Sequence, residues 1–146
     1  MLQKDKDYKI SREQGKDVGT YTINIDIIED GPVSTNYYFQ TITPGTYTIT
    51  QKTATLIADD KVQEYGENQV ALTVSSQDYV YDDKLVEGED YTISRSDSEN
   101  HNVGEYVISA VVIAEGPVAK NYNFTTQNGT YTITKAKAEI IPLGGG

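Results

Sequence analysis

The chain has 146 residues and a formal net charge of -10, from 22 Asp and Glu residues against 12 Lys and Arg. A surface this acidic repels phosphate backbones and anionic lipid headgroups, which argues against nucleic-acid binding. The sequence has no apolar run of about 18 residues, so no membrane span is expected. The charged segment Met1–Asp7 has no apolar stretch, so no signal peptide is expected either.

The residue composition favours β-structure and offers little for catalysis. The sequence contains 12 Tyr, 17 Thr, 14 Ile and 12 Val but only five Leu, and β-branched and aromatic residues fit the pleated surface of a sheet. With one His and no Cys or Trp, a nucleophile, a base and an orienting group are hard to assemble. The composition predicts an all-β module that is not an enzyme and that uses no cofactor or metal.

Apolar and polar residues alternate along several short segments, as in strands with one buried face. Over residues 20–27, Tyr and Ile alternate with Thr, Asn and Asp. Residues 107–113 are apolar on both faces and predict a central or doubly covered strand. In chain order, strands are expected at residues 8–12, 20–27, 46–50, 54–58, 70–74, 79–81, 91–95, 107–113, 121–126 and 130–134.

Gly and Pro separate these segments, and Asn128-Gly129 between two Thr-rich runs is a typical hairpin turn. Short turns predict antiparallel pairing, and regularly spaced short strands favour small antiparallel β-sandwich (Ig-like) modules in tandem. The alternative is a β-grasp-like fold, which requires a helix of about ten residues. The best helical segment, residues 63–72, contains Gly66, so the sandwich is preferred.

Four segments of the sequence recur at an offset of 83 to 85 residues, which indicates a tandem repeat. The matching segments are 7–12 and 90–95, 18–23 and 103–108, 31–39 and 116–124, and 45–50 and 129–134.

The first copy has no counterpart of residues 54–89. Residues 1–51 are therefore interpreted as the back portion of a first repeat, and residues 52–137 as a complete second repeat. Residues 138–146 are interpreted as the start of a further repeat plus a flexible Gly tail. The chain is expected to be a section of a longer array.

The second copy carries a set of short motifs: Ala58-Asp-Asp-Lys61, Tyr65-Gly66, Ser94-Arg95, Val103-Gly-Glu-Tyr-Val-Ile108, Asn121-Tyr122 and Thr130 to Lys135. Together they resemble the MBG family of repeats, which occur in tandem in bacterial surface proteins and adhesins. The resemblance covers nearly all of the second copy and begins at Asp7 in the first. One departure is the loop 96–102, where the family has a Gly that the first copy keeps as Gly15.

The resemblance implies a non-enzymatic extracellular module that acts as a stalk or spacer in an adhesin. It places the module at the cell surface, attached to the cell wall in the full-length protein, and carries over no catalytic, cofactor-binding or metal-binding residue. The alternative is a module that itself binds a host glycan or a mucin-like glycoprotein. The expected partners are neighbouring repeats, such a host ligand, and a second copy of the chain in a homodimer formed by strand pairing.

Few side chains suggest chemistry, and a structural role is preferred for each. His101 is expected to be a solvated loop residue. The acidic clusters at Asp59-Asp60, Asp82-Asp83 and 87–90 lack the spacing of a calcium loop, so solvated loops are preferred over a weak cation site. A glycosidase would need a cleft and aromatic platforms, and the sequence has no Trp. A Lys–Asn isopeptide bond would need a buried Lys.

Alternation also assigns the core. The expected core residues are Ile23, Ile25, Tyr47 and Ile49 in the first copy, and Ile108, Val112, Tyr131 and Ile133 in the second. Core positions are preferred over a sugar-binding surface for most Tyr residues. The hydroxyls of Tyr21, Tyr47, Tyr106 and Tyr131 are expected to reach carbonyl groups at the sheet edge.

The incomplete first copy is expected to leave a sheet edge without its partner strands. Residues 135–141 resemble the opening strand of a repeat and have no domain of their own. We therefore expect this segment to supply the missing strand to another copy of the chain.

Overall fold

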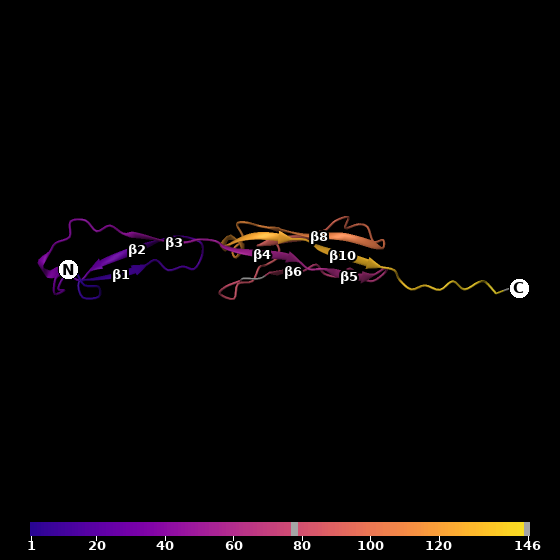
Figure 1. Ribbon diagram of the computed structural model, residues 1–146, viewed down its shortest axis with the longest axis horizontal. Coiled ribbons are helices and arrows are strands. Elements are labelled where there is room, and N and C mark those ends of the chain that lie inside the picture. Colours follow the sequence, from indigo (N-terminus) through magenta and orange to yellow (C-terminus); the bar gives the residue numbers. More distant parts are fainter. Residues whose placement is uncertain (77–78, 145–146) are drawn as a thin grey trace. The chain divides into compact units, whose positions relative to one another are not determined.

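The structure is a computed structural model that describes residues 1–76 and 79–144, and it is built from strands (Figure 1). The chain divides into two compact units, Met1–Gln51 (unit 1) and Lys52–Gly146 (unit 2). The described residues contain no α-helix, and two short 3-10 helices stand beside the strands. The prediction of an all-β protein is confirmed. The helix that a β-grasp-like fold would need is absent from the described residues, because residues 63–72 contain the end of a strand and a turn.

Unit 1 is a single antiparallel sheet of three strands. It consists of β1 (Tyr8–Arg12), β2 (Gly19–Ile27) and β3 (Gly45–Ile49) in the order β1-β2-β3, with the 3-10 helix η1 (Ser34–Asn36) between β2 and β3. Ile10 pairs with Ile25, and Tyr21 pairs with Tyr47. Residues 37–44 connect η1 to β3 without forming a strand.

The described residues of unit 2 form two sheets. The first has the order β5-β10-β8-β7 and the second has the order β6-β4-β9. Their elements are β4 (Lys52–Ala58), β5 (Lys61–Glu64), β6 (Val74–Ser76), β7 (Tyr91–Arg95), β8 (Gly104–Val112), η2 (Ala119–Asn121), β9 (Tyr122–Gln127) and β10 (Gly129–Thr134). The second sheet packs on the first where β4 and β9 contact β8.

The expectation that all sheets are antiparallel is wrong. Strand β4 pairs in parallel with β9, from Lys52↔Tyr122 to Ile57↔Gln127. Strand β5 likewise pairs in parallel with β10, from Lys61↔Tyr131 to Glu64↔Thr134. The expected hairpin at Asn128-Gly129 does not form, because β9 and β10 belong to different sheets.

Gly129 has a packing role at this junction. A Cβ at this position would collide with the carbonyl oxygen of Ala58, so the close approach of the two backbones requires glycine.

The core of the protein lies in unit 2. Its buried cluster consists of Ala58, Tyr106, Ile108, Tyr131 and Ile133, and Val70, Leu72 and Ile93 pack against it. Ile108, Tyr131 and Ile133 are core residues as predicted, whereas Val112 is only half-buried.

Strand β8 is central in its sheet, between β10 and β7, which is one of the two predicted positions, but it is not covered on both faces. Val107 and Val111 are 49% and 63% exposed. One face of β8 is therefore solvated, and the apolar run reflects β-propensity rather than double burial.

The predicted core of unit 1 is wrong. Ile23, Ile25 and Ile49 are half-buried and Tyr47 is 44% exposed, although their counterparts in unit 2 lie in the core or beside it. The reason is architectural, because the described residues of unit 1 form one sheet and a sheet needs a second layer to bury its apolar face.

Two strand assignments also differ from the prediction. The strand expected at residues 70–74 lies later, at Val74–Ser76, and residues 79–81 form no strand. Strand β5, over Lys61–Glu64, was not predicted because its four residues are too few for a periodic signal.

The difference in burial between the two units predicts a difference in mutational cost. Ile108→Ala should destabilise unit 2 by about 2–5 kcal/mol because Ile108 is fully buried. The equivalent substitution Ile23→Ala in half-buried surroundings should cost unit 1 less than about 2 kcal/mol. Amide hydrogen exchange, followed separately for each unit, measures both values. Equal losses would contradict the difference in packing.

Candidate functional site

One carboxylate in each copy is fully buried and holds a long loop in place. Asp90 accepts hydrogen bonds from the backbone N–H groups of Val118 and Ala119 at 2.9 Å and of Val86 at 2.9 Å. These bonds join the segment before β7 to the start of η2. A Cβ at Gly116 would collide with the Asp90 carboxylate, so this approach also requires glycine.

Unit 1 repeats this arrangement with Asp7. Its carboxylate accepts hydrogen bonds from the backbone N–H groups of Gln3, Val33 and Ser34, each at 2.8 Å. Burial raises the pKa of Asp7, but the hydrogen bonds from Ser34, Gln3 and Val33 outweigh burial and lower the pKa to about 2. Asp7 therefore remains ionised in the folded unit at pH values below the ordinary pKa of an aspartate.

Three of the other acidic residues that the sequence singled out, Asp59, Asp60 and Asp83, accept hydrogen bonds from the chain itself. Asp59 accepts hydrogen bonds from the hydroxyls of Thr73 and Ser75 at 2.7 Å, and Asp60 accepts one from the N–H of Thr130 at 2.8 Å. Asp83 accepts the Tyr122 hydroxyl at 2.7 Å. Across residues 1–76 and 79–144, no three His, Cys, Asp or Glu side chains are grouped as metal ligands.

Arg12 in unit 1 and Arg95 in unit 2 each lie against two tyrosine rings. The Arg95 guanidinium lies 4.4 Å from the Tyr106 ring centre and 5.1 Å from that of Tyr131, and it donates hydrogen bonds to four backbone carbonyls of the loop 96–100. This loop stands where unit 1 has the connection that contains Gly15. Asp97 there adopts a φ of 53°. His101 is exposed beside it, as predicted.

The tyrosine hydroxyls follow the prediction in part. The hydroxyl of Tyr21 donates to Asp17 O and that of Tyr106 donates to Asn102 O, both at 2.6 Å. Buried Tyr131 instead donates to the side chain of Gln63 and accepts the N–H of Val70. None of the described lysines is buried, so the described residues lack the buried Lys that an isopeptide bond needs.

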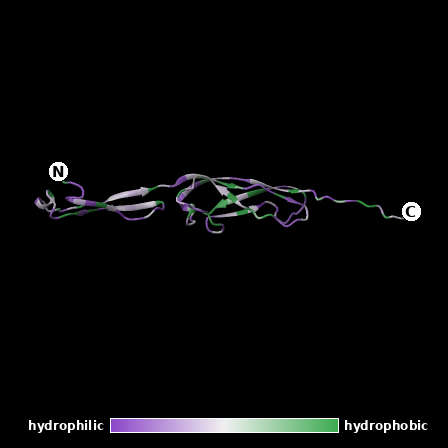
Figure 2. Cartoon of the chain, turned by 90° about the horizontal axis from the view of Figure 1, so that it is seen from below, coloured by the Kyte–Doolittle hydropathy of each residue, from purple (hydrophilic) through white to green (hydrophobic). Residues whose placement is uncertain are grey.

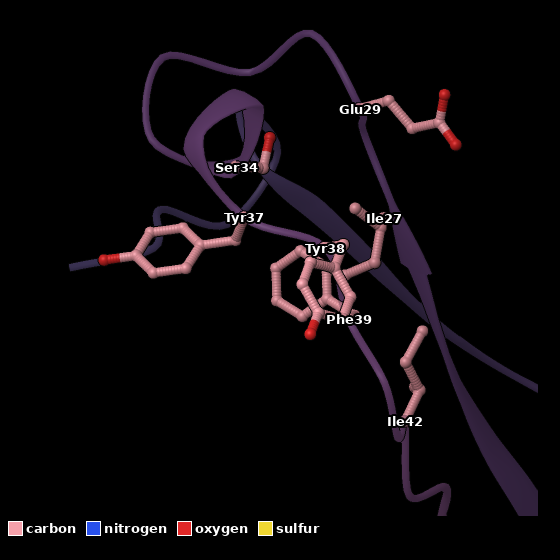
Figure 3. Close-up of a pocket in the computed structure, with 7 residues that line it drawn as sticks. All are labelled: Ile27, Glu29, Ser34, Tyr37, Tyr38, Phe39 and Ile42. Carbon is pink, nitrogen blue, oxygen red and sulfur yellow. The ribbon is translucent and has the colours of Figure 1, made fainter.

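An aromatic and aliphatic groove opens on the surface of unit 1, and we call it the unit 1 groove (Figure 3). Two adjoining hollows of about 410 and 390 Å³ share Ile27, Phe39 and Ile42 in their walls. Tyr37 and Tyr38 border it and are 63% and 88% exposed. Figure 3 shows the Tyr37 ring extending away from Ile27. Sequence reasoning placed most tyrosines in the core and missed this exposed pair.

The same surface is closed in unit 2. Tyr122, the counterpart of Tyr37, is 4% exposed because β4 pairs with its strand and Tyr79 packs edge-on against its ring at 5.5 Å. The repeated Asn-Tyr motif predicted the similarity of the two segments. Only the absence of a counterpart of residues 54–89 in the first copy signalled that one of them would stay open.

Comparison with known proteins gives one match. Residues 54–132 match the family described as MBG domain (YGX type). The matched range contains the core of unit 2 and most of its two sheets. No curated protein and no solved structure matches the chain. In residues 1–76 and 79–144, no helix is long and apolar enough to cross a membrane.

The lowered pKa of Asp7 predicts acid sensitivity of unit 1. Its ordinary value is 3.8, so the contribution of the carboxylate is complete above that pH and is lost as the pH falls toward about 2. The carboxyl ¹³C shift of Asp7 should titrate with a midpoint near 2, and amide exchange in unit 1 should speed up over the same range. Asp7→Asn should destabilise unit 1 and remove this pH dependence. A midpoint at the ordinary aspartate value would contradict the hydrogen-bonded arrangement.

Proposed function

Because the chain belongs to the MBG family (YGX type), whose domains are repeats of bacterial surface proteins, we propose that it is a stalk or spacer module of an adhesin. In this proposal the module is non-enzymatic, extracellular and attached to the cell wall through the full-length protein. Its task is to hold a distal binding region away from the cell. The path of the chain through unit 2 is the observation that carries the proposal.

The chain enters unit 2 at one end and leaves it at the opposite end (Figure 1). Residues 52–64 form β4 and β5, and residues 122–134 form β9 and β10, which pair with them in parallel. We call these two successive parallel pairs together the parallel ladder. Lys52 lies at the start of the first pair and Thr134 at the end of the second. Twelve residue steps at about 3.3 Å span roughly 40 Å, so each such unit adds that length to an array.

A pulling force along the array loads this ladder in shear. The force acts on Lys52 and Thr134 in opposite directions along parallel strands, so the hydrogen bonds of both parallel pairs resist together. Strands pulled apart at one end would instead lose their hydrogen bonds one after another. Resistance to forced unfolding is a matter of the unfolding rate, and shear geometry raises the barrier to that step. This property suits a stalk.

Single-molecule pulling in two geometries tests the proposal. The sequence has no Cys, so handles can be placed without interference. Thr53→Cys with Lys135→Cys loads the ladder in shear, and Thr53→Cys with Asn123→Cys separates a directly paired residue couple. The shear geometry should need several-fold higher force, and unit 2 should unfold in one step. Equal forces in the two geometries would contradict a stalk role.

The exposed Tyr37 and Tyr38 support a second candidate, in which the module itself binds a host glycan or a mucin-like glycoprotein. Aromatic rings on an exposed surface are typical of recognition sites. A glycan array and a mucin pull-down with the chain and with Tyr38→Ala separate the two candidates. If the unsubstituted chain binds and Tyr38→Ala does not, the second candidate is favoured. If the unsubstituted chain binds neither the glycans nor mucin, the second candidate is overturned.

A further inference from the structure

We infer that the segment 136–142 of one copy of the chain inserts as a strand into the unit 1 groove of a second copy. The contact would add to unit 1 the layer that β4 supplies in unit 2. This inference concerns self-association, and it stands or falls separately from the mechanical role proposed above.

The groove has the character of an uncovered core. Apolar side chains of the N-terminal segment, β1, β2 and the segment after η1 line it, namely Leu2, Tyr8, Ile10, Ile25, Ile27 and Phe39. Ile10 and Ile42 are 47% and 44% exposed. Since burial of apolar area is the main favourable term in association, this surface gains from any apolar strand that fits it.

Unit 2 shows which strand fits. There β4 runs parallel to β9, and its alternate residues Ala54, Leu56 and Ala58 are at most 2% exposed. Strand β4 contacts β8, whose counterpart in unit 1 is β2. The segment after η1 in unit 1, from Tyr37 onward, occupies the place of β9 but has no partner strand among the described residues.

The segment 136–142 repeats the pattern of β4. Counted from the shared Gly-Thr-Tyr-Thr-Ile-Thr sequence, Ala138, Ile140 and Pro142 stand where β4 has Ala54, Leu56 and Ala58. The segment forms no strand, and Figure 2 shows the chain running on to the C-terminus as a plain trace. Ile140 is 98% exposed. The chain thus exposes both an apolar segment with the pattern of β4 and the groove that lacks a counterpart of β4.

The β4–β9 register carries over to the proposed contact. Leu56 pairs with Thr126, and Thr55 pairs with Thr125. Since Tyr37 and Phe39 correspond to Tyr122 and Phe124, Glu139 should pair with Gln40. In this register Lys135 lies toward η1, on the side where Glu29 lines the groove. The opposite charges of these two side chains favour the contact.

A second copy is the favoured donor because of the path of the chain in unit 2. Lys52, to which unit 1 is joined, lies at the start of the parallel ladder, and Thr134 lies at its far end. Only Lys135 separates Thr134 from the segment, and one residue spans less than about 4 Å. A contact between a tail and a groove is heterologous, so it can join successive copies head to tail.

Sedimentation velocity over a wide range of concentration tests the association. The mass of the intact chain should rise with concentration. Ile140→Asn should abolish the rise, whereas the control Lys137→Asn, at the position of exposed Thr53, should retain it. Both substitutions lie outside the strands, so neither disturbs the folded units. A monomer at every concentration, or equal behaviour of the two variants, would overturn the inference.

Disulfide trapping tests the register and the donor. A mixture of Gln40→Cys and Glu139→Cys chains should form a disulfide-linked dimer at least about tenfold faster than a mixture of Gln40→Cys and Lys137→Cys, which lies two residues out of register and beyond disulfide reach. Equal rates would overturn the register. A chain carrying both Gln40→Cys and Glu139→Cys that closes on itself as a dilute monomer would overturn the second copy as donor.

Discussion

The covering of the β8 face by β4 is the contact on which the rest of unit 2 depends. A sheet has two faces, and its apolar face becomes a core only when a second layer lies on it. In unit 2 the inner side chains of β4 complete this layer, and Ile108 of β8 becomes fully buried. In unit 1 the equivalent strand β2 carries Ile at the same position, and that residue stays half-exposed. The segment 54–89, which supplies β4 together with Val70 and Leu72, therefore makes the difference between a packed core in unit 2 and an open groove in unit 1.

This dependence explains which parts of the fold could be predicted from the sequence. Alternation identified β2 and β10 and the inward side of each, because periodicity is a local property of the chain. Burial is not local. Ile23 and Ile108 occupy the same repeat position, and what differs is a strand that is more than forty residues away from Ile108 in the sequence. Periodicity cannot indicate whether the second layer is present.

Parallel pairing was missed for a related reason. Asn128-Gly129 is a typical turn sequence, but here Gly129 lets the backbone pass against the carbonyl of Ala58. Glycine serves both needs, and the sequence does not distinguish a chain that reverses from one that continues into another sheet. A strand of only four residues, β5, completes the second parallel pair, and its shortness hid the topology.

The buried aspartates show the opposite case, in which the repeat contained the signal and its meaning was missed. Asp7 and Asp90 each precede Tyr, and each is followed later in its copy by Gly-Pro-Val, which begins at Gly31 in the first copy and at Gly116 in the second. An acidic residue suggests solvent, yet three backbone N–H groups satisfy each carboxylate, which is what allows a charged group to be buried. The two bonds from the start of each 3-10 helix fix where the chain turns after β2 and β8. That turn sends the following segment, 37–44 or β9, back across the sheet to the place where a parallel partner is needed. The aspartate therefore orients this following segment in both units. It does so whether a parallel partner strand lies beside the segment, as β4 does in unit 2, or not, as in unit 1.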